Sequence, residues 1–224
     1  MKRSVIIVAG GSGTRMGVEL PKQYLGLAGK PMIVHTLEKF LHFDPAIEVV
    51  VVLDPSHQQH WDIIRAQYAP AKQFAVAQGG ASRFDSVKNG LAHVQDGRVV
   101  GIHDAVRPLV SQGTIERTYS AAVRWGSGIP VVSMEDSVRL LDGEKGSTGV
   151  DRTRLRRVQT PQVFLSERLR EAYQHAGHSE FTDDASVYES HFGQVYLVEG
   201  NRENIKITTP SDLKLAGALI QMPG

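Results

Sequence analysis

Short β-branched segments alternate with helix-period segments along most of this chain, and that alternation restricts the folds open to it. The runs predicted to be strands lie at residues 4–9, 48–53, 74–77, 99–103, 129–132, 195–198 and 205–207. Such alternation is typical of βαβ units. It predicts an α/β fold: a Rossmann-like, mostly parallel sheet with helices on both faces. No repeat or linker divides the sequence, so we expect one domain over residues 1–224.

One segment, residues 133–159, interrupts the alternation. It lacks helical periodicity, and two polar, β-prone stretches flank the sequence Asp142-Gly143-Glu144-Lys145-Gly146, which favours a hairpin turn. A long hairpin cannot bury both of its faces by itself. We therefore expect an extended β-hairpin arm at about 133–159 that packs on a second copy of the chain, giving a homodimer. A mobile surface excursion is the alternative.

Composition excludes several classes of protein. The 25 Lys and Arg residues nearly balance the 24 Asp and Glu residues, so the charge calls for neither a nucleic-acid nor a membrane partner. The apolar run from Val5 to Ala9 ends at glycines and is too short for a signal-peptide core or a membrane span. The sequence has no cysteine, which excludes disulfides and thiolate metal sites and fits a reducing compartment. We therefore expect a cytoplasmic protein.

A glycine-rich loop follows the first predicted strand. It reads AGGSGTRMG over residues 9–17, and Pro21 and Lys22 come after it. Ligands of open α/β sheets bind just beyond the carboxyl ends of the strands, where glycines let backbone amides approach phosphate oxygens. The loop therefore predicts a polyphosphate site.

Three kinds of glycine loop compete for that position. A P-loop ends in Lys followed by Ser or Thr, which Arg15-Met16 does not supply. The dinucleotide motif GxGxxG would place Met16 at its third glycine, and Asp54 matches its acidic residue only loosely. In a nucleotidyl-transfer loop, Arg15 and Lys22 would stabilise the negative charge that develops on an α-phosphate. The alternative without a function is a tight turn followed by two solvated cations.

Several motifs, spread over nearly the whole chain, resemble those of one enzyme family. They are VAGGSGTRMGVELPKQYLGLAGKPMIVHTL, GGASRFDSVKNGL, HDAVRPLV, VDRTRLRRVQTPQVF, FTDDASVYE and VEGNRENIKITTPSDLKLA, in that order. They resemble the nucleotidyltransferases that activate sugar-alcohol phosphates, above all the 2-C-methyl-D-erythritol 4-phosphate cytidylyltransferase family of the non-mevalonate isoprenoid route. The resemblance implies transfer of CMP from CTP to 2-C-methyl-D-erythritol 4-phosphate, with release of pyrophosphate.

The resemblance also implies roles for particular residues. The implied catalytic residues are Arg15, Lys22, Arg152 and Lys206; the implied nucleotide-binding residues are Ala9, Gly10, Gly11, Gly13, Gly80, Ala81 and Ser86; and the implied acceptor-binding residues are Asp104, Arg107, Ser137 and Thr160. Ala81 stands where the family often has an acidic residue, and Ser137 where it commonly has threonine.

A metal and a partner subunit follow from the same resemblance. Asp104 suits Mg²⁺ that is held mainly by phosphates, since this ion takes few protein ligands. In the family, Ser137 and Arg152 reach from the arm into the partner's site, so we expect a catalytic homodimer. Two alternatives stay open: a ribitol-5-phosphate cytidylyltransferase, which usually has a different sequence around Arg152, and a regulatory module that binds nucleotides without turnover.

Two adjacent carboxylates, Asp183 and Asp184, could be taken for an acid/base pair. Neighbouring side chains on a helix point in different directions, which argues against a shared proton. We expect these residues to begin a helix and to position other groups, with Thr182 as the N-cap.

Overall fold

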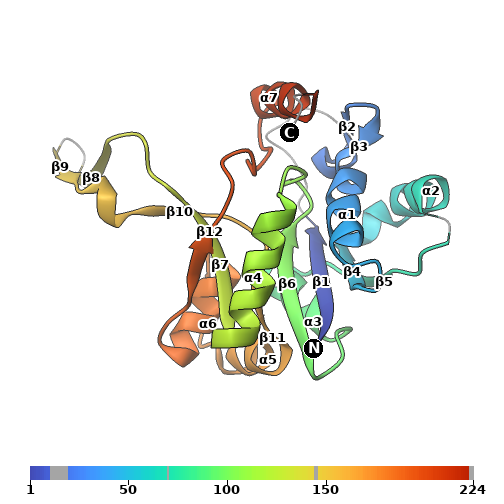
Figure 1. Cartoon of the computed structure of the whole chain (residues 1–224), viewed down its shortest axis with the longest axis horizontal. Helices are drawn as coiled ribbons and strands as arrows, with labels where there is room; N and C mark the ends of the chain where they lie inside the picture. The colour runs from blue at the N-terminus through green and yellow to red at the C-terminus, as the bar shows by residue number, and fades with distance from the viewer. Residues whose placement is uncertain (11–19, 70, 144–145, 222–224) are drawn as a thin grey trace.

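An eight-stranded sheet crosses the middle of the computed structural model, which describes residues 1–10, 20–69, 71–143 and 146–221 (Figure 1). The strands lie in the order β10-β7-β11-β6-β1-β4-β5, and β12 also pairs with β7. Their bounds are β1 (Lys2–Ala9), β4 (Glu48–Leu53), β5 (Ala75–Gln78), β6 (Arg98–Asp104), β7 (Ser127–Ser133), β10 (Arg156–Val158), β11 (Gln162–Leu165) and β12 (Leu197–Glu199).

The four neighbouring strands β6, β1, β4 and β5 are parallel to one another. Successive residues of β1, Val5, Ile6 and Ile7, have no exposed surface, so this strand is buried on both of its faces. Continuous apolar strands of this kind are typical of parallel sheets that helices cover from both sides. The predicted mostly parallel α/β sheet is confirmed, with β10 and β11 as antiparallel strands beside β7.

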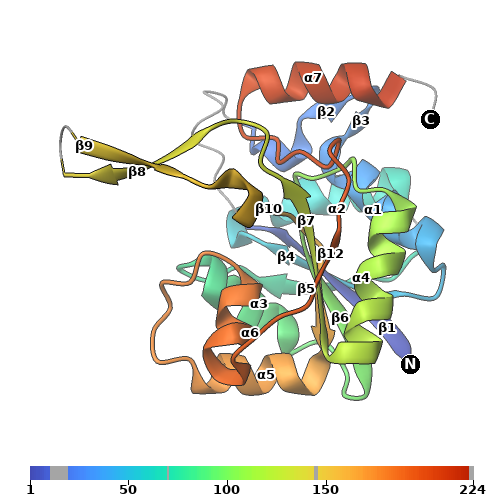
Figure 2. The same cartoon turned by 60° about the vertical axis from the view of Figure 1, so that its left-hand side comes forward.

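Helices cover both faces of the sheet (Figure 2). They are α1 (Met32–Phe43), α2 (Gln58–Tyr68), α3 (Arg83–Leu91), α4 (Gln112–Trp125), α5 (Ser166–His175) and α6 (Asp184–Phe192). A further helix, α7 (Pro210–Gln221), packs in a separate apolar cluster with Leu27, Met32 and Ile207. No helix of the described residues is both long enough and apolar enough to cross a bilayer.

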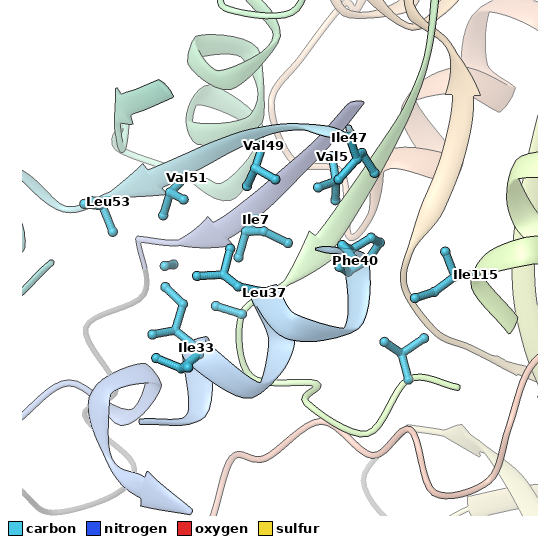
Figure 3. Packing of buried hydrophobic residues seen from close by; sticks show 14 of the residues in the cluster. Val5, Ile7, Ile33, Leu37, Phe40, Ile47, Val49, Val51, Leu53 and Ile115 are labelled. Carbon is cyan, nitrogen blue, oxygen red and sulfur yellow. The ribbon is translucent and has the colours of Figure 1, made fainter. Parts of the chain in front are cut away.

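The alternation of side chains along β1 separates the two hydrophobic cores. Val5 and Ile7 pack with α1, α2 and α4, where Leu37 and Phe40 of α1 lie against the sheet (Figure 3). Ile6 points to the other face and packs with α3, α5 and α6. Because successive residues of a strand face opposite sides, one short apolar strand anchors both layers.

An antiparallel hairpin of β8 (Val138–Asp142) and β9 (Gly146–Val150) projects from the body of the molecule (Figures 1 and 2). It is the hairpin predicted within residues 133–159, although the end of that range returns to the sheet as β10. Leu140 and Leu141 of β8 are 67% and 78% exposed. Within the single chain, the arm therefore leaves apolar surface in water.

Two strand predictions are wrong in detail. Residues 205–207 form no strand; Ile207 is buried beside α7, and its amide donates a single hydrogen bond to the carbonyl oxygen of Val106 (3.0 Å). The strand predicted at 195–198 is β12, which begins at Leu197 and ends at Glu199. The sequence pattern also missed β11, a four-residue strand that directly follows Pro161.

Candidate active site

A cavity of about 340 Å³ opens at the carboxyl ends of β1 and β6. This is the edge of an open α/β sheet at which ligands bind. Distant parts of the chain line it: Val8, Ala9, Gly10, Lys22, Gln23, Gly80, Ala81, Ser82, Arg83, Ser86, Asp104, Ala105, Val106 and Lys206. Eight of the residues implied by the resemblance are among them.

The start of α3 shapes one wall of this cavity. Ser82 caps the helix by accepting a hydrogen bond from the amide of Asp85 (3.1 Å), and the amide of Gly80 donates to Ser86 Oγ (3.0 Å). A Cβ atom at Gly80 would lie 2.3 Å from Cβ of Asp85, closer than real Cβ contacts, so glycine is required there. The backbone of Gly80, which lines the cavity, therefore packs directly against the first turn of α3.

Gln23 holds the Lys22 segment against β1. It lies in a short 3-10 helix, η2 (Lys22–Tyr24), is 1% exposed, and donates from Nε2 to the carbonyl oxygen of Ala9 (2.7 Å). This buried bond joins the last residue of β1 to the segment that brings Lys22 to the cavity. The sequence motif contains Gln23 next to Lys22, but it does not indicate this role.

Asp104, the last residue of β6, lies among three cations. Its Oδ2 atom is 3.1 Å from Lys206 Nζ and 3.2 Å from Arg107 Nε, and Oδ1 is 3.8 Å from Arg83 Nε. Burial raises the pKa of the Asp104 carboxyl, but Arg83, Lys206 and Arg107 outweigh it and hold the pKa well below its usual range. Asp104 is therefore ionised, and its carboxylate holds Arg83, Arg107 and Lys206 together from three separate parts of the chain.

Arg83 is the principal site residue that the sequence did not single out. Its Nη2 donates to Asp184 Oδ2 (2.6 Å), and its other edge faces Asp104. Burial lowers the pKa of the Arg83 guanidinium, yet Asp184 and Asp104 raise it above its ordinary value. The motif GGASRFDSV contains Arg83, but its two anionic partners are 21 and 101 positions away in the chain, so no local pattern connects them.

Asp184 and its neighbour begin α6. Asp183, not Thr182, is the N-cap, because its Oδ1 accepts from the amide of Ser186 (2.9 Å). Asp184 is fully buried. The two carboxylates have separate partners, as expected from their adjacency.

A chain of hydrogen bonds fixes the loop after β6. The amide of Asp104 donates to Thr160 Oγ1 (3.1 Å), and Thr160 Oγ1 lies 3.1 Å from Nδ1 of His103. His103 Nε2 lies 3.1 Å from the carbonyl oxygen of Arg107, which can only accept, so Nε2 carries the proton and Nδ1 accepts from Thr160. Burial lowers the pKa of His103 to about 4, so the ring is neutral near pH 7.

A second cavity, of about 280 Å³, adjoins the first. Arg83, Asp104 and Lys206 contribute to both. The remaining lining residues of the second cavity are Arg107, Val158, Gln159, Thr160, Gln162, Thr182 and Asp183. Arg107 and Thr160, implied to bind the acceptor, therefore lie apart from the implied nucleotide-binding residues but beside the same cations.

The remaining implied site residues are elsewhere or undescribed. Gly11, Gly13 and Arg15 lie outside the described residues. Ser137 and Arg152 belong to the arm; both are exposed, and neither lines either cavity of this chain. Arg152 Nη1 donates to the carbonyl oxygen of Glu135, at the base of the arm.

The described residues do not build a metal site of their own. No group of three or more His, Cys, Asp or Glu side chains among them is arranged to hold a metal ion. Asp104, the implied ligand, already faces cations with both carboxylate oxygens. A Mg²⁺ ion at this site would therefore depend on oxygens that a substrate brings.

Comparison with known proteins assigns the chain to a family. The family model of 2-C-methyl-D-erythritol 4-phosphate cytidylyltransferases matches residues 4–222. The chain belongs to this cytidylyltransferase family. A cytidylyltransferase of that name from Bacteroides fragilis is 50% identical over 220 residues, which are 98% of this chain and 100% of the relative. The one from Bacteroides thetaiotaomicron is 49% identical over 220 residues, with the same coverage.

Solved structures of cytidylyltransferases have the same fold. The crystal structure of the 2-C-methyl-D-erythritol 4-phosphate cytidylyltransferase from Thermus thermophilus gives a TM-score of 0.77 at 35% identity, over 99% of this chain and 100% of that one. The 4-diphosphocytidyl-2C-methyl-D-erythritol synthase from Anaerococcus prevotii gives 0.84 at 27% identity, over 99% of both chains. The family and the enzyme class predicted from the motifs are confirmed.

Proposed function

We propose that this chain transfers the CMP group of CTP to 2-C-methyl-D-erythritol 4-phosphate, giving 4-diphosphocytidyl-2-C-methyl-D-erythritol and pyrophosphate. The proposal is carried by one observation: two adjoining cavities share Arg83, Asp104 and Lys206, in a chain that matches the cytidylyltransferase family over residues 4–222. Two anionic substrates that must react need such neighbouring pockets with cations between them.

The reaction is a substitution at phosphorus. A phosphate oxygen of the acceptor attacks the α-phosphorus of CTP, the bond from that phosphorus to the bridging oxygen breaks, and pyrophosphate leaves with the bonding electrons. The nucleophile is already an anion, so the enzyme needs no general base. Charge stabilisation and alignment then supply most of the acceleration. We assign this stabilisation to Lys22 and to Arg15 of the glycine-rich sequence.

The first cavity is the proposed CTP site. Its wall of backbone at Gly10, Gly80 and Ala81, with the Ser86 hydroxyl nearby, would read the edge of a pyrimidine with fixed donors and acceptors. Ala9 completes this wall, and Gly11 and Gly13 belong to the same proposed phosphate loop.

The second cavity is the proposed acceptor site. Lys206 and Arg107 would bind the phosphate of the acceptor, and Thr160 and Asp104 its polar groups. We assign Ser137 and Arg152 to the same substrate in the site of a partner subunit, because both flank the β8–β9 hairpin and lie outside the cavities of their own chain. The exposed Leu140 and Leu141 of the arm support a homodimer.

The divalent cation enters with CTP in this proposal. Mg²⁺ would neutralise charge on the triphosphate and would be held mainly by phosphate oxygens, with Asp104 nearby. The absence of cysteine supports the cytoplasm as the compartment of the reaction.

Measuring pyrophosphate release tests nucleotide, acceptor and class together. CTP, UTP, ATP and GTP are each combined with 2-C-methyl-D-erythritol 4-phosphate or with ribitol 5-phosphate, in the presence of Mg²⁺. We expect turnover with CTP and the erythritol phosphate. Faster turnover with ribitol 5-phosphate would favour the other acceptor, and nucleotide binding without pyrophosphate release would favour a regulatory module.

A further inference from the structure

A buried ion pair lies behind the two cavities. The carboxylate of Asp184 is fully buried, and each of its oxygens has one donor: Oδ2 accepts from Arg83 Nη2 (2.6 Å) and Oδ1 from the hydroxyl of Tyr173 (2.7 Å). Burial raises the pKa of Tyr173 well above its ordinary value, so the hydroxyl keeps its proton and donates. Tyr173 is held in turn by stacking on Phe84, with ring centroids 4.6 Å apart.

The guanidinium of Arg83 is planar and rigid, so fixing one edge also orients the other. Asp184 fixes the Nη2 edge, and Nε then faces Asp104 Oδ1 at 3.8 Å, beyond hydrogen-bond distance. Arg83 is therefore drawn toward the buried carboxylate and away from full pairing with Asp104.

Asp104 is left to bind other cations. Its Oδ2 lies 3.1 Å from Lys206 Nζ and 3.2 Å from Arg107 Nε. If Arg83 were released, its fork could close on Asp104 as a bidentate pair, which is the geometry that guanidinium and carboxylate favour. Arg83 would then compete with Lys206 for the same carboxylate.

We infer that Asp184 and Tyr173 are positioning residues: they hold Arg83 in the orientation that leaves Asp104 to fix Lys206 beside the second cavity. The inference rests on the proposed function, in which Lys206 binds the phosphate of the acceptor. Neither residue lines either cavity, so both act on the substrate through Arg83.

Substituting Tyr173→Phe tests this with the least disturbance, because the ring and its stacking on Phe84 remain and only the hydroxyl is lost. We expect KM for the acceptor to rise about fivefold, the scale of one buried hydrogen bond, while KM for CTP changes less than about twofold. Asp184→Asn removes the charge that holds Arg83 and should raise the acceptor KM by about tenfold or more, since a charge-assisted bond is roughly twice as strong.

Tyr188→Phe is the matched control. Tyr188 is a buried tyrosine of α6 that stacks on Phe164, and its hydroxyl accepts from Arg168 (3.4 Å), away from both cavities. Urea unfolding of all variants measures their stabilities separately from the kinetics. If the Tyr173 hydroxyl served only the stability of the fold, Tyr173→Phe would lower the free energy of unfolding. The KM for the acceptor would then be the same in Tyr173→Phe and Tyr188→Phe, which would contradict the inference.

The wild-type assay separates this inference from the proposed function. A wild type that does not use the acceptor overturns the proposed function and the inference with it. An active wild type whose acceptor KM is unchanged by Tyr173→Phe overturns the inference alone. If Asp184→Asn does not fold, Tyr173→Phe still decides the outcome.

Discussion

Acidification should destabilise the protein through one buried residue, His103. Its ring is 0% exposed, its Nδ1 accepts from Thr160, and its Nε2 donates to the carbonyl oxygen of Arg107. The bond that Nδ1 accepts requires the neutral ring, because a protonated ring carries a hydrogen on both nitrogens. Burial lowers the pKa of His103 from 6.5 to about 4, so the folded protein resists a proton that the unfolded chain accepts.

The sign and size of the effect follow from that difference. Above pH 6.5 the ring is neutral in both states. As the pH falls from 6.5 to about 4, the unfolded chain binds a proton and the folded protein does not, so the free energy of unfolding decreases. The total loss is about 3 kcal/mol, at about 1.4 kcal/mol for each pH unit between the two pKa values. Protonation of Asp104 changes the free energy of unfolding only at lower pH, because the pKa of Asp104 lies well below 3.8 in the folded protein.

The assay compares the wild type with His103→Gln by urea unfolding, at fixed protein concentration, from about pH 7 to about pH 4. Glutamine offers a neutral amide nitrogen that donates and a carbonyl oxygen that accepts, but it does not titrate. We expect the wild type to lose about 3 kcal/mol more than the variant over this range. Parallel pH dependences in the two proteins would refute the claim that His103 is buried in its neutral form.

Three further substitutions test other parts of the site. Lys22→Ala should lower kcat by about two to three orders of magnitude, the scale of losing a transition-state donor; unchanged pyrophosphate release would remove Lys22 from the chemistry. Arg152→Ala should raise KM for the acceptor while calorimetry shows that CTP still binds, and mixing it with Lys22→Ala should restore turnover if the arm acts in the partner's site. Failure of that mixture, with hybrid dimers shown to form, would place the arm's action in its own subunit. Gly80→Ala should destabilise the protein by about 1–3 kcal/mol through overpacking against Asp85 and raise KM for CTP, whereas Gly177→Ala, with open space around its Cβ, should do neither.

Two central strands of the parallel sheet could be predicted because their apolar runs are long and buried on both faces. β1 and β4 are continuous runs of this kind. β11 has only four residues and follows a proline, so local composition does not distinguish it from a loop; its pairing with β6 and β7 defines it. Residues 205–207 have the composition of a strand but do not form one. Ile207 is buried because it packs beside α7, and it needs no pairing with a neighbouring strand.

The clustering of candidate site residues could be predicted where those residues lie in motifs at the ends of strands. Gly10, Gly80 and Asp104 lie in motifs at the ends of strands, and the sheet places those ends at one edge. The contacts that connect the motifs were not predictable. The bond from Arg83 to Asp184 joins residues 101 positions apart, and the bond from Thr160 to Nδ1 of His103 joins residues 57 positions apart. Sequence spacing carries no information on such pairs until the fold is known.

The walls that the two cavities have in common imply that their occupants cannot bind independently. An anion bound in either cavity interacts with the positive charges of Arg83 and Lys206. It therefore changes the electrostatic potential in the other cavity. Thermodynamic linkage makes this influence reciprocal: the factor by which the first ligand changes the affinity of the second equals the factor by which the second changes that of the first. Reversing the order of arrival would change the sequence of complexes formed but not the free energy of the ternary complex.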